Sequence, residues 1–194
     1  MKKLSVKVIS DALKKLGHKV FEKGEYNLNL IGIRSKDETT NTFNDVLVVM
    51  FKQTGNWVLM QFDCTTDPGQ FYLENPLSVH GCAIVKPDQY PGLWSLGYHR
   101  GQYRALTQTK PVTVYRDNDG DRVLDFENPQ TGLFGINCHR AMKDGESETV
   151  NRWSAGCQVL ANSDDFDILI SLCEKAASVW GDSFTYTLIN ETDL

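Results

Sequence analysis

A cysteine and a histidine in suitable surroundings are the residues of this chain that could best do chemistry. Cys157 lies in the stretch NRWSAGCQVL, after the small residues Ala155 and Gly156 and before an apolar run that is typical of a strand. His139 lies in FGINCHRAMKDG, at the end of another strand-like run, and 14 residues separate it from Ser154. A loop of that length can bring two strand ends side by side.

Such a pair could transfer acyl groups. A cysteine attacks an acyl carbon at neutral pH when a base, usually histidine, helps to form the thiolate and amide N–H groups stabilise the oxyanion that results. A thiol activated in this way has a lowered pKa and should react quickly with alkylating reagents below neutral pH. The alternative is that Cys157 is only a small buried hydrophobe, since free cysteine is among the most buried residue types.

The motifs INCHRA and SAGC, with this gap between them, resemble the signature of the L,D-transpeptidase (YkuD-like) catalytic domain family, in particular its short phage-type members. That signature is a histidine, a gap of this size and then Ser/Thr-His-Gly-Cys. The resemblance covers about residues 134–160, and the strand-rich region from residue 26 onward is compatible with that domain. Two positions depart from it: Ala155 replaces the family's second histidine, and Gln158-Val159 replaces an apolar residue followed by arginine or asparagine.

The resemblance implies a role for each of these residues. Cys157 would be the nucleophile and His139 the general base and acid, while Ser154 would shape the turn. The implied oxyanion hole consists of the backbone amides of Ala155, Gly156 and Cys157. The substrate would be a peptidoglycan stem peptide, whose acyl group passes through the cysteine to water or to an amine. Hydrolysis would cut or trim the wall, aminolysis would cross-link it, and neither needs a cofactor or a metal.

A second polar stretch, LGYHRGQYRAL, is a candidate for substrate binding. Its His99 and Arg100 lie between glycines, where a loop can meet a cleft, and arginine pairs well with the carboxylates of a wall peptide. Arg140 and Trp153 flank the proposed site in the sequence and are candidates for the same role. An ordinary solvated loop is the alternative for each of the four.

Two patterns could suggest a metal site. His80 and Cys82, with His99 as a third ligand, lack the tight pairs that structural zinc sites show.

Cys138, next to the candidate base on a strand, should point to the opposite face and pack in the core.

The second pattern is the stretch DNDGDRVLD, which places Asp117, Asp119 and Asp121 at alternating positions like a calcium-binding loop. Arg122 occupies the sixth position, where an EF-hand has glycine, and Asn128 the twelfth, where it has glutamate. The sequence therefore favours a plain hairpin turn within PVTVYRDNDGDRVLDFE, and we expect no metal site.

The remaining patterns predict a single strand-dominated α+β domain. Apolar side chains at helical spacing predict a short helix over residues 4–16 that ends at Gly17. Runs rich in branched and aromatic residues predict strands in YNLNLIGIRS, DVLVVMFK, NWVLMQFDCTT and SFTYTLI. Ser163 should cap a helix through residue 180, whose predicted buried stripe is Phe166, Leu169, Ile170, Cys173, Ala177 and Trp180.

We therefore expect a YkuD-like β-sandwich, with residues 1–25 as a helical appendage and residues 26–194 as the catalytic domain. The chain has 194 residues and a net charge of −5 with both signs interspersed, so it can bury one core and has no basic footprint for nucleic acid. No apolar run approaches the ~20 residues that cross a bilayer.

The cysteines suggest where the chain is made. The five of them form no CxxC pair, and no signal peptide is recognisable, which favours reduced thiols and synthesis in the cytoplasm. A wall substrate would then be reached after release, as by a phage endolysin.

Two other functions stay open. A zinc-dependent wall peptidase would need a His-x6-Asp pair, but Pro87 follows His80 at that distance and Glu146 follows His139. A non-catalytic wall-binding or virion protein that keeps the fold would explain the departures around Cys157.

Overall fold

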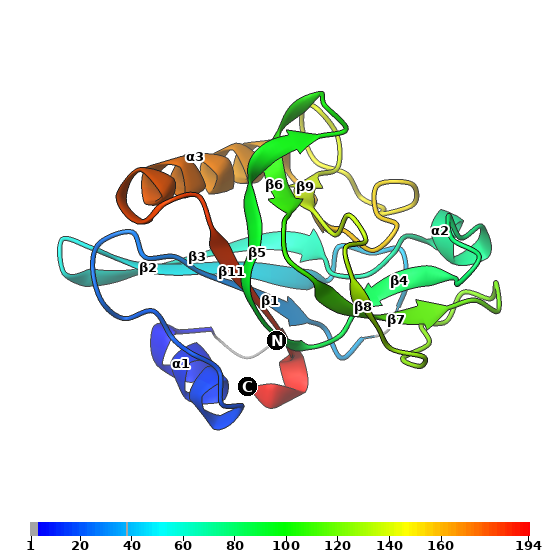
Figure 1. The fold of residues 1–194 in the computed structure, drawn as a ribbon, viewed down its shortest axis with the longest axis horizontal. Helices are drawn as coiled ribbons and strands as arrows, with labels where there is room; N and C mark the ends of the chain where they lie inside the picture. The colour runs from blue at the N-terminus through cyan, green and yellow to red at the C-terminus, as the bar shows by residue number, and fades with distance from the viewer. Residues whose placement is uncertain (1–3, 38) are drawn as a thin grey trace.

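The strands of this chain form one ring and one small separate sheet. A computed structural model describes residues 4–37 and 39–194. Its strands are β1 Asn29–Arg34, β2 Asp45–Gln53, β3 Asn56–Thr65, β4 Cys82–Val85, β5 Asp88–His99, β6 Tyr103–Gln108, β7 Val112–Asp117, β8 Gln130–Gly132, β9 Cys138–Arg140, β10 Gln158–Leu160 and β11 Phe184–Asn190. The ring runs β1-β11-β5-β6-β9-β10-β3-β2, and the separate sheet runs β4-β7-β8 (Figure 1).

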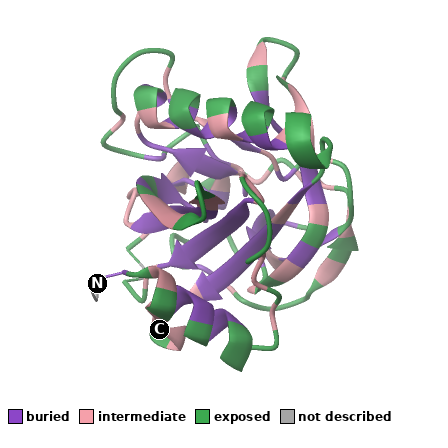
Figure 2. Cartoon of the chain, turned by 90° about the vertical axis from the view of Figure 1, so that its left-hand side faces the viewer, coloured by how far each residue is buried: buried purple, intermediate pink, exposed green. Residues whose placement is uncertain are grey.

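The helices lie outside the ring. They are α1 Val6–Lys15, α2 Gln70–Glu74 and α3 Ser163–Trp180, and a 3₁₀ turn, η1 Glu191–Asp193, follows β11. Figure 1 shows α1 and α3 on opposite sides of the barrel, and in Figure 2 their outward faces are exposed while the central strands between them are largely buried. Among the described residues, no helix combines the length and apolarity that a bilayer crossing requires.

The apolar strand β2 is buried on both faces. Its side chains alternate, so that Leu47, Val49 and Phe51 join the core inside the barrel. The intervening Val48 and Met50 belong to a second cluster under α1. This is why the sequence here is an unbroken apolar run and not an alternating one.

The helix α1 forms as predicted and packs on the barrel. Its N-cap is Ser5, whose Oγ accepts a hydrogen bond from the Val8 amide at 3.3 Å, and Gly17 follows its end with a φ of 79°. Ile9 and Leu13 are buried in the cluster under α1. The helix therefore contacts the strands directly, and the division of the chain at residue 25 stays a prediction.

The cap predicted for the long helix α3 is wrong by one residue. Asn162 is the N-cap, and its Oδ1 accepts hydrogen bonds from the amides of Asp164 and Asp165 at 2.8 and 3.4 Å. Ser163 is instead the first helical residue, and its Oγ accepts from the Gly145 amide at 2.9 Å. Both side chains could cap a helix, and the loop through Gly145 occupies the serine.

The buried stripe of α3 is confirmed over its first three turns and wrong at its end. Ala176 takes the buried place expected of Ala177, and Trp180 is 52% exposed. The indole Nε1 of Trp180 donates to the Glu25 carbonyl at 2.8 Å, so the ring covers the loop before β1 and does not enter the core. The confirmed members of the stripe are Phe166, Leu169, Ile170 and Cys173.

The hairpin predicted around DNDGD is wrong. β7 ends at Asp117 and pairs with β8, which begins at Gln130, while the twelve residues 118–129 between them form no strand. The Asp119 side chain accepts a hydrogen bond from the Asp121 amide, and the Asp121 side chain accepts one from the Val123 amide. Such local bonds compete with a strand ladder for the same amides, so the segment curls into a loop.

The structure is α+β and strand-dominated, as predicted, but its main sheet closes where a two-sheet sandwich was expected. β1 pairs with β11 in parallel on one side and with β2 in antiparallel on the other, which completes the ring. Nothing in the local patterns of these strands records that the first and last strands pair.

Leucine-to-alanine substitutions in α1 should show whether it belongs to the core. Leu13 is 1% exposed and Leu16 is 41% exposed. We expect Leu13→Ala to lower the free energy of unfolding by about 2–5 kcal/mol, and Leu16→Ala to change it by about 0.5 kcal/mol or less. Urea unfolding of both variants measures this, and equal small losses would mean that α1 is a detachable appendage.

Candidate active site

The candidate base His139 lies on β9, and the candidate nucleophile Cys157 immediately precedes β10, which pairs with β9 in parallel. β9 and β10 are aligned so that Cys138 faces Gln158 and His139 faces Val159. Paired residues on adjacent strands point to the same face, and alternate residues share a face. Cys157, one residue before Gln158, therefore lies on the same face as His139, and both line one cavity of about 450 Å³. The expectation that the 14-residue gap brings the two motifs together is confirmed.

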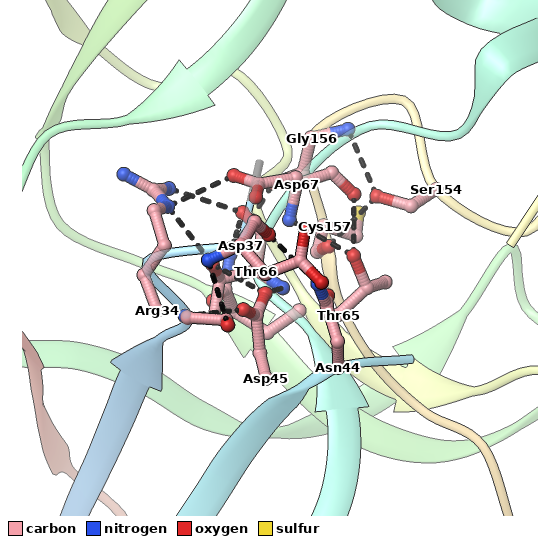
Figure 3. Close-up of polar contacts among 12 residues, drawn as sticks. Arg34, Asp37, Asn44, Asp45, Thr65, Thr66, Asp67, Ser154, Gly156 and Cys157 are labelled. Atoms are coloured by element: carbon pink, nitrogen blue, oxygen red, sulfur yellow. Dashed lines mark hydrogen bonds and ion pairs between the residues drawn. The ribbon is translucent and has the colours of Figure 1, made fainter. Parts of the chain in front are cut away.

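The turn before Cys157 is held by a serine, as predicted. The Ser154 side chain is fully buried, and its Oγ donates to the Cys157 carbonyl at 2.8 Å and accepts from the Gly156 amide at 3.1 Å (Figure 3). Gly156 has a φ of 120°, and a Cβ there would lie 2.4 Å from the Ala83 carbonyl oxygen. Only glycine fits this position, because both its backbone conformation and its contact with β4 exclude a side chain.

This turn changes the predicted oxyanion hole. The Gly156 amide already donates to Ser154, so it is engaged within the turn and is not available as expected. Among the described residues, the amides of Ala155 and Cys157 donate to no other group. These two N–H groups are the remaining candidates for binding an oxyanion.

The thiol of Cys157 is protonated at rest. Burial raises its pKa, although the Asn137 backbone N–H and the charge of Arg100 oppose the rise. Its Sγ donates a hydrogen bond to the Gly135 carbonyl at 3.4 Å. In the unliganded site, burial thus outweighs the groups that would stabilise a thiolate.

The imidazole of His139 is neutral and held in one orientation. Its Nδ1 lies 2.8 Å from the Arg140 carbonyl oxygen, which can only accept, so Nδ1 carries the hydrogen and Nε2 the free lone pair. Burial, the His99 ring stacked at 4.0 Å and the charge of Arg100 lower the pKa of His139 to about 3. Tyr103, from the polar stretch LGYHRGQYRAL, places its hydroxyl 3.4 Å from Nδ1.

A basic groove adjoins the cysteine cavity. It has a volume of about 960 Å³ and shares His99, Arg100, His139 and Trp153 with that cavity. Its cationic lining residues are Arg100, Arg140, Lys143 and Arg152, and no carboxylate is among the described residues that line it. The four predicted substrate-binding residues, His99, Arg100, Arg140 and Trp153, thus all lie around one opening.

A buried polar network lies behind the turn and was not predicted. Gln158 accepts a hydrogen bond from the Tyr186 hydroxyl at 2.6 Å, and its Nε2 is 3.5 Å from the Thr66 carbonyl oxygen. Thr66 donates from its amide and hydroxyl to Asp45 at 2.6 and 2.8 Å, and its hydroxyl accepts from Arg34 at 3.1 Å (Figure 3). The glutamine that departs from the family signature therefore has a structural role in the barrel.

Cys138 lies in the barrel core, as predicted, and so do Cys64 and Cys173, while Cys82 is buried beside β7. Cys157 is the one cysteine that is not fully buried.

Comparison of the chain with models of known protein families, with curated proteins and with solved structures gives no match.

The alkylation rate of Cys157 should report its raised pKa. Only the thiolate reacts, and its fraction rises roughly tenfold per pH unit below the pKa, so the rate of modification by iodoacetamide should climb through pH 7–9 without a plateau. Peptide mass spectrometry locates the modified residue, and Cys157→Ser is the control. A constant rate below pH 7 would instead show a thiolate–imidazolium pair.

Proposed function

We propose that this chain is a cysteine-dependent acyl-transfer enzyme that acts on peptidoglycan stem peptides, an L,D-peptidase or L,D-transpeptidase of the YkuD-like kind. The observation that carries the proposal is the placement of a thiol and a neutral imidazole along one cavity, next to two paired strands. A nucleophile, a base with a fixed tautomer and two unused amides are the groups that acyl transfer requires.

The mechanism begins with two neutral partners. As Cys157 Sγ attacks the peptide carbonyl, His139 Nε2 takes the thiol proton, and the amides of Ala155 and Cys157 stabilise the oxyanion. When the tetrahedral intermediate collapses, the protonated His139 gives its proton to the leaving amine, and a thioester remains. Water or a second amine, deprotonated by His139, then attacks the thioester and releases the cysteine as a thiol.

The basic groove supports an acidic substrate. Stem peptides carry carboxylates, and guanidinium groups bind them through paired hydrogen bonds. Arg152 stacks on the Phe71 ring at 3.9 Å and Arg140 on the Tyr103 ring at 4.4 Å, so both guanidinium groups are held in place at the groove. A carboxylate bound there would lie beside the cavity that holds the thiol.

A second candidate is a wall-binding protein that keeps the groove without turnover. The raised pKa of Cys157 favours it, because a protonated thiol is a weak nucleophile. In either case the protein would act at the wall after release from the cell, as an endolysin-like protein does.

Substitution of the two central residues should separate the candidates. We expect the wild-type protein to release a terminal amino acid, cut a cross-bridge or form a new cross-link in purified muropeptides and sacculi. Cys157→Ala should abolish this change, and His139→Gln should lower kcat by about 10²–10⁴-fold. Mass spectrometry of the products measures both.

The matched control is His18→Gln, which replaces a histidine outside the site, and circular dichroism should show that every variant is folded. Added 1,10-phenanthroline, which binds zinc, should leave the cysteine enzyme active. A wild-type protein that binds sacculi and changes nothing would reject the enzyme and support the wall-binding protein.

Removal of one groove charge should weaken substrate binding. We expect Arg152→Gln to raise KM about tenfold, because one charge-assisted hydrogen bond to a carboxylate is lost. Arg104→Gln is the matched control, since Arg104 pairs with Glu174 at 3.4 Å and does not line the groove. Equal changes in KM for the two variants would mean that the groove does not bind the acidic part of the substrate.

A further inference from the structure

The loop that follows β7 brings several carboxylates together, and one of them has an oxygen without a hydrogen-bond partner among the described residues. Asp117, the last residue of β7, is 1% exposed, and its Oδ1 has no hydrogen-bond partner in the part of the chain that the structure describes. Its Oδ2 accepts from the Asp125 amide at 3.2 Å. Leaving a buried carboxylate oxygen without a partner is costly, so this atom points to a missing ligand.

Two more carboxylates lie beside it. Asp117, Asp119 and Asp125 can each offer one ligand atom such that all three atoms lie within 4.8 Å of one another. None of the three forms an ion pair with a lysine or arginine of residues 4–37 and 39–194. The neighbouring Arg122 pairs instead with Glu74 on α2. The negative charges are thus uncompensated within the described chain.

Although the sequence led us to expect no metal site in this loop, we propose that Asp117, Asp119 and Asp125 bind one calcium ion. All the ligand atoms are carboxylate oxygens, which hard cations prefer, and no nitrogen or sulfur that would favour zinc is in the group. Calcium binds oxygen at about 2.3–2.6 Å and therefore spans ligands up to about 5 Å apart, whereas magnesium spans about 4 Å. Backbone carbonyls and water would complete the coordination.

The electrostatics of the loop agree with this assignment. Asp119, Asp121 and Asp125 place negative charge around Asp117. A divalent cation would offset the repulsion among these carboxylates. It would also supply the partner that Asp117 Oδ1 lacks.

The ion would stabilise one wall of the cysteine cavity. Asp117 pairs with Cys82 across the β4–β7 ladder, and a Cβ on Gly81 would lie 2.1 Å from the Asp117 carbonyl oxygen. The cavity that contains the thiol is lined by Gly81 and Cys82, and also by Arg116, the residue before Asp117. Fixing the end of β7 would therefore fix this wall, whether or not the site is catalytic.

Calorimetry and thermal unfolding of the full chain test the site. Protein stripped with EDTA and dialysed free of it should bind CaCl₂ at one saturable site. Its melting temperature should rise by about 5–10 °C when calcium reaches about a hundred times its Kd. MgCl₂ at the same concentration should raise it less. No heat of binding and no shift with about 10 mM calcium, well above the range of weak protein sites, would overturn the proposal.

Variants make the test specific. Asp119 is exposed, so Asp119→Asn should fold as the wild type does and weaken calcium binding more than about tenfold. Asp167→Asn, which removes an exposed carboxylate from α3, is the matched control and should bind calcium normally. Unchanged binding by Asp119→Asn, or equal losses in both variants, would contradict the proposal. Neither readout depends on activity, so the result is independent of the proposed function.

Discussion

The parallel pairing of β9 and β10 is the constraint on which the candidate site depends. Each strand has three residues, and their register alone sets which face Cys157 and His139 share. So short a parallel pair cannot be stable by itself, because its ladder has few hydrogen bonds and its connection is long. The pair persists because β6 flanks β9 and β3 flanks β10 in the closed ring. The barrel is thus what positions the chemistry.

Hydrogen bonds inside the barrel connect its strands to the turn before Cys157. The Tyr186 hydroxyl on β11 reaches Gln158 on β10, and Gln158 reaches Thr66 just after β3. Gly32 permits this, since a Cβ there would lie 2.0 Å from the Tyr186 hydroxyl oxygen. Thr66 donates a hydrogen bond to Asp45 and accepts one from Arg34 on its hydroxyl. Burial raises the pKa of Asp45 to about 7. The hydrogen bonds among these buried groups favour a single arrangement of the turn.

Patterns of neighbouring residues predicted the helices and strands whose formation depends mainly on their own sequence. Both main helices, the strands β1, β2, β3, β7 and β11 and the meeting of the two motifs were predicted from spacing and apolar runs. The hairpin of β5 and β6 was missed, because the polar stretch around His99 and Arg100 suggests a loop. Barrel closure depends on pairing between β1 and β11, which are separated by most of the chain, and no local pattern encodes that choice. The loop after Asp117 was misassigned because its turn residues suit a hairpin and a curled acidic loop equally well. The raised pKa of Cys157 depends on burial, which the sequence does not show.

The burial of His139 beside His99 has a consequence for how partners approach the groove. Burial lowers the pKa of both imidazoles, so neither adds charge above about pH 6.5. The positive potential of the groove then comes from Arg100, Arg140 and Arg152 together with Lys143. An acidic partner would therefore be steered to the opening at a rate that responds to ionic strength and hardly to pH. The groove would thus attract acidic partners, and salt would screen this attraction, although the whole chain has a net charge of −5.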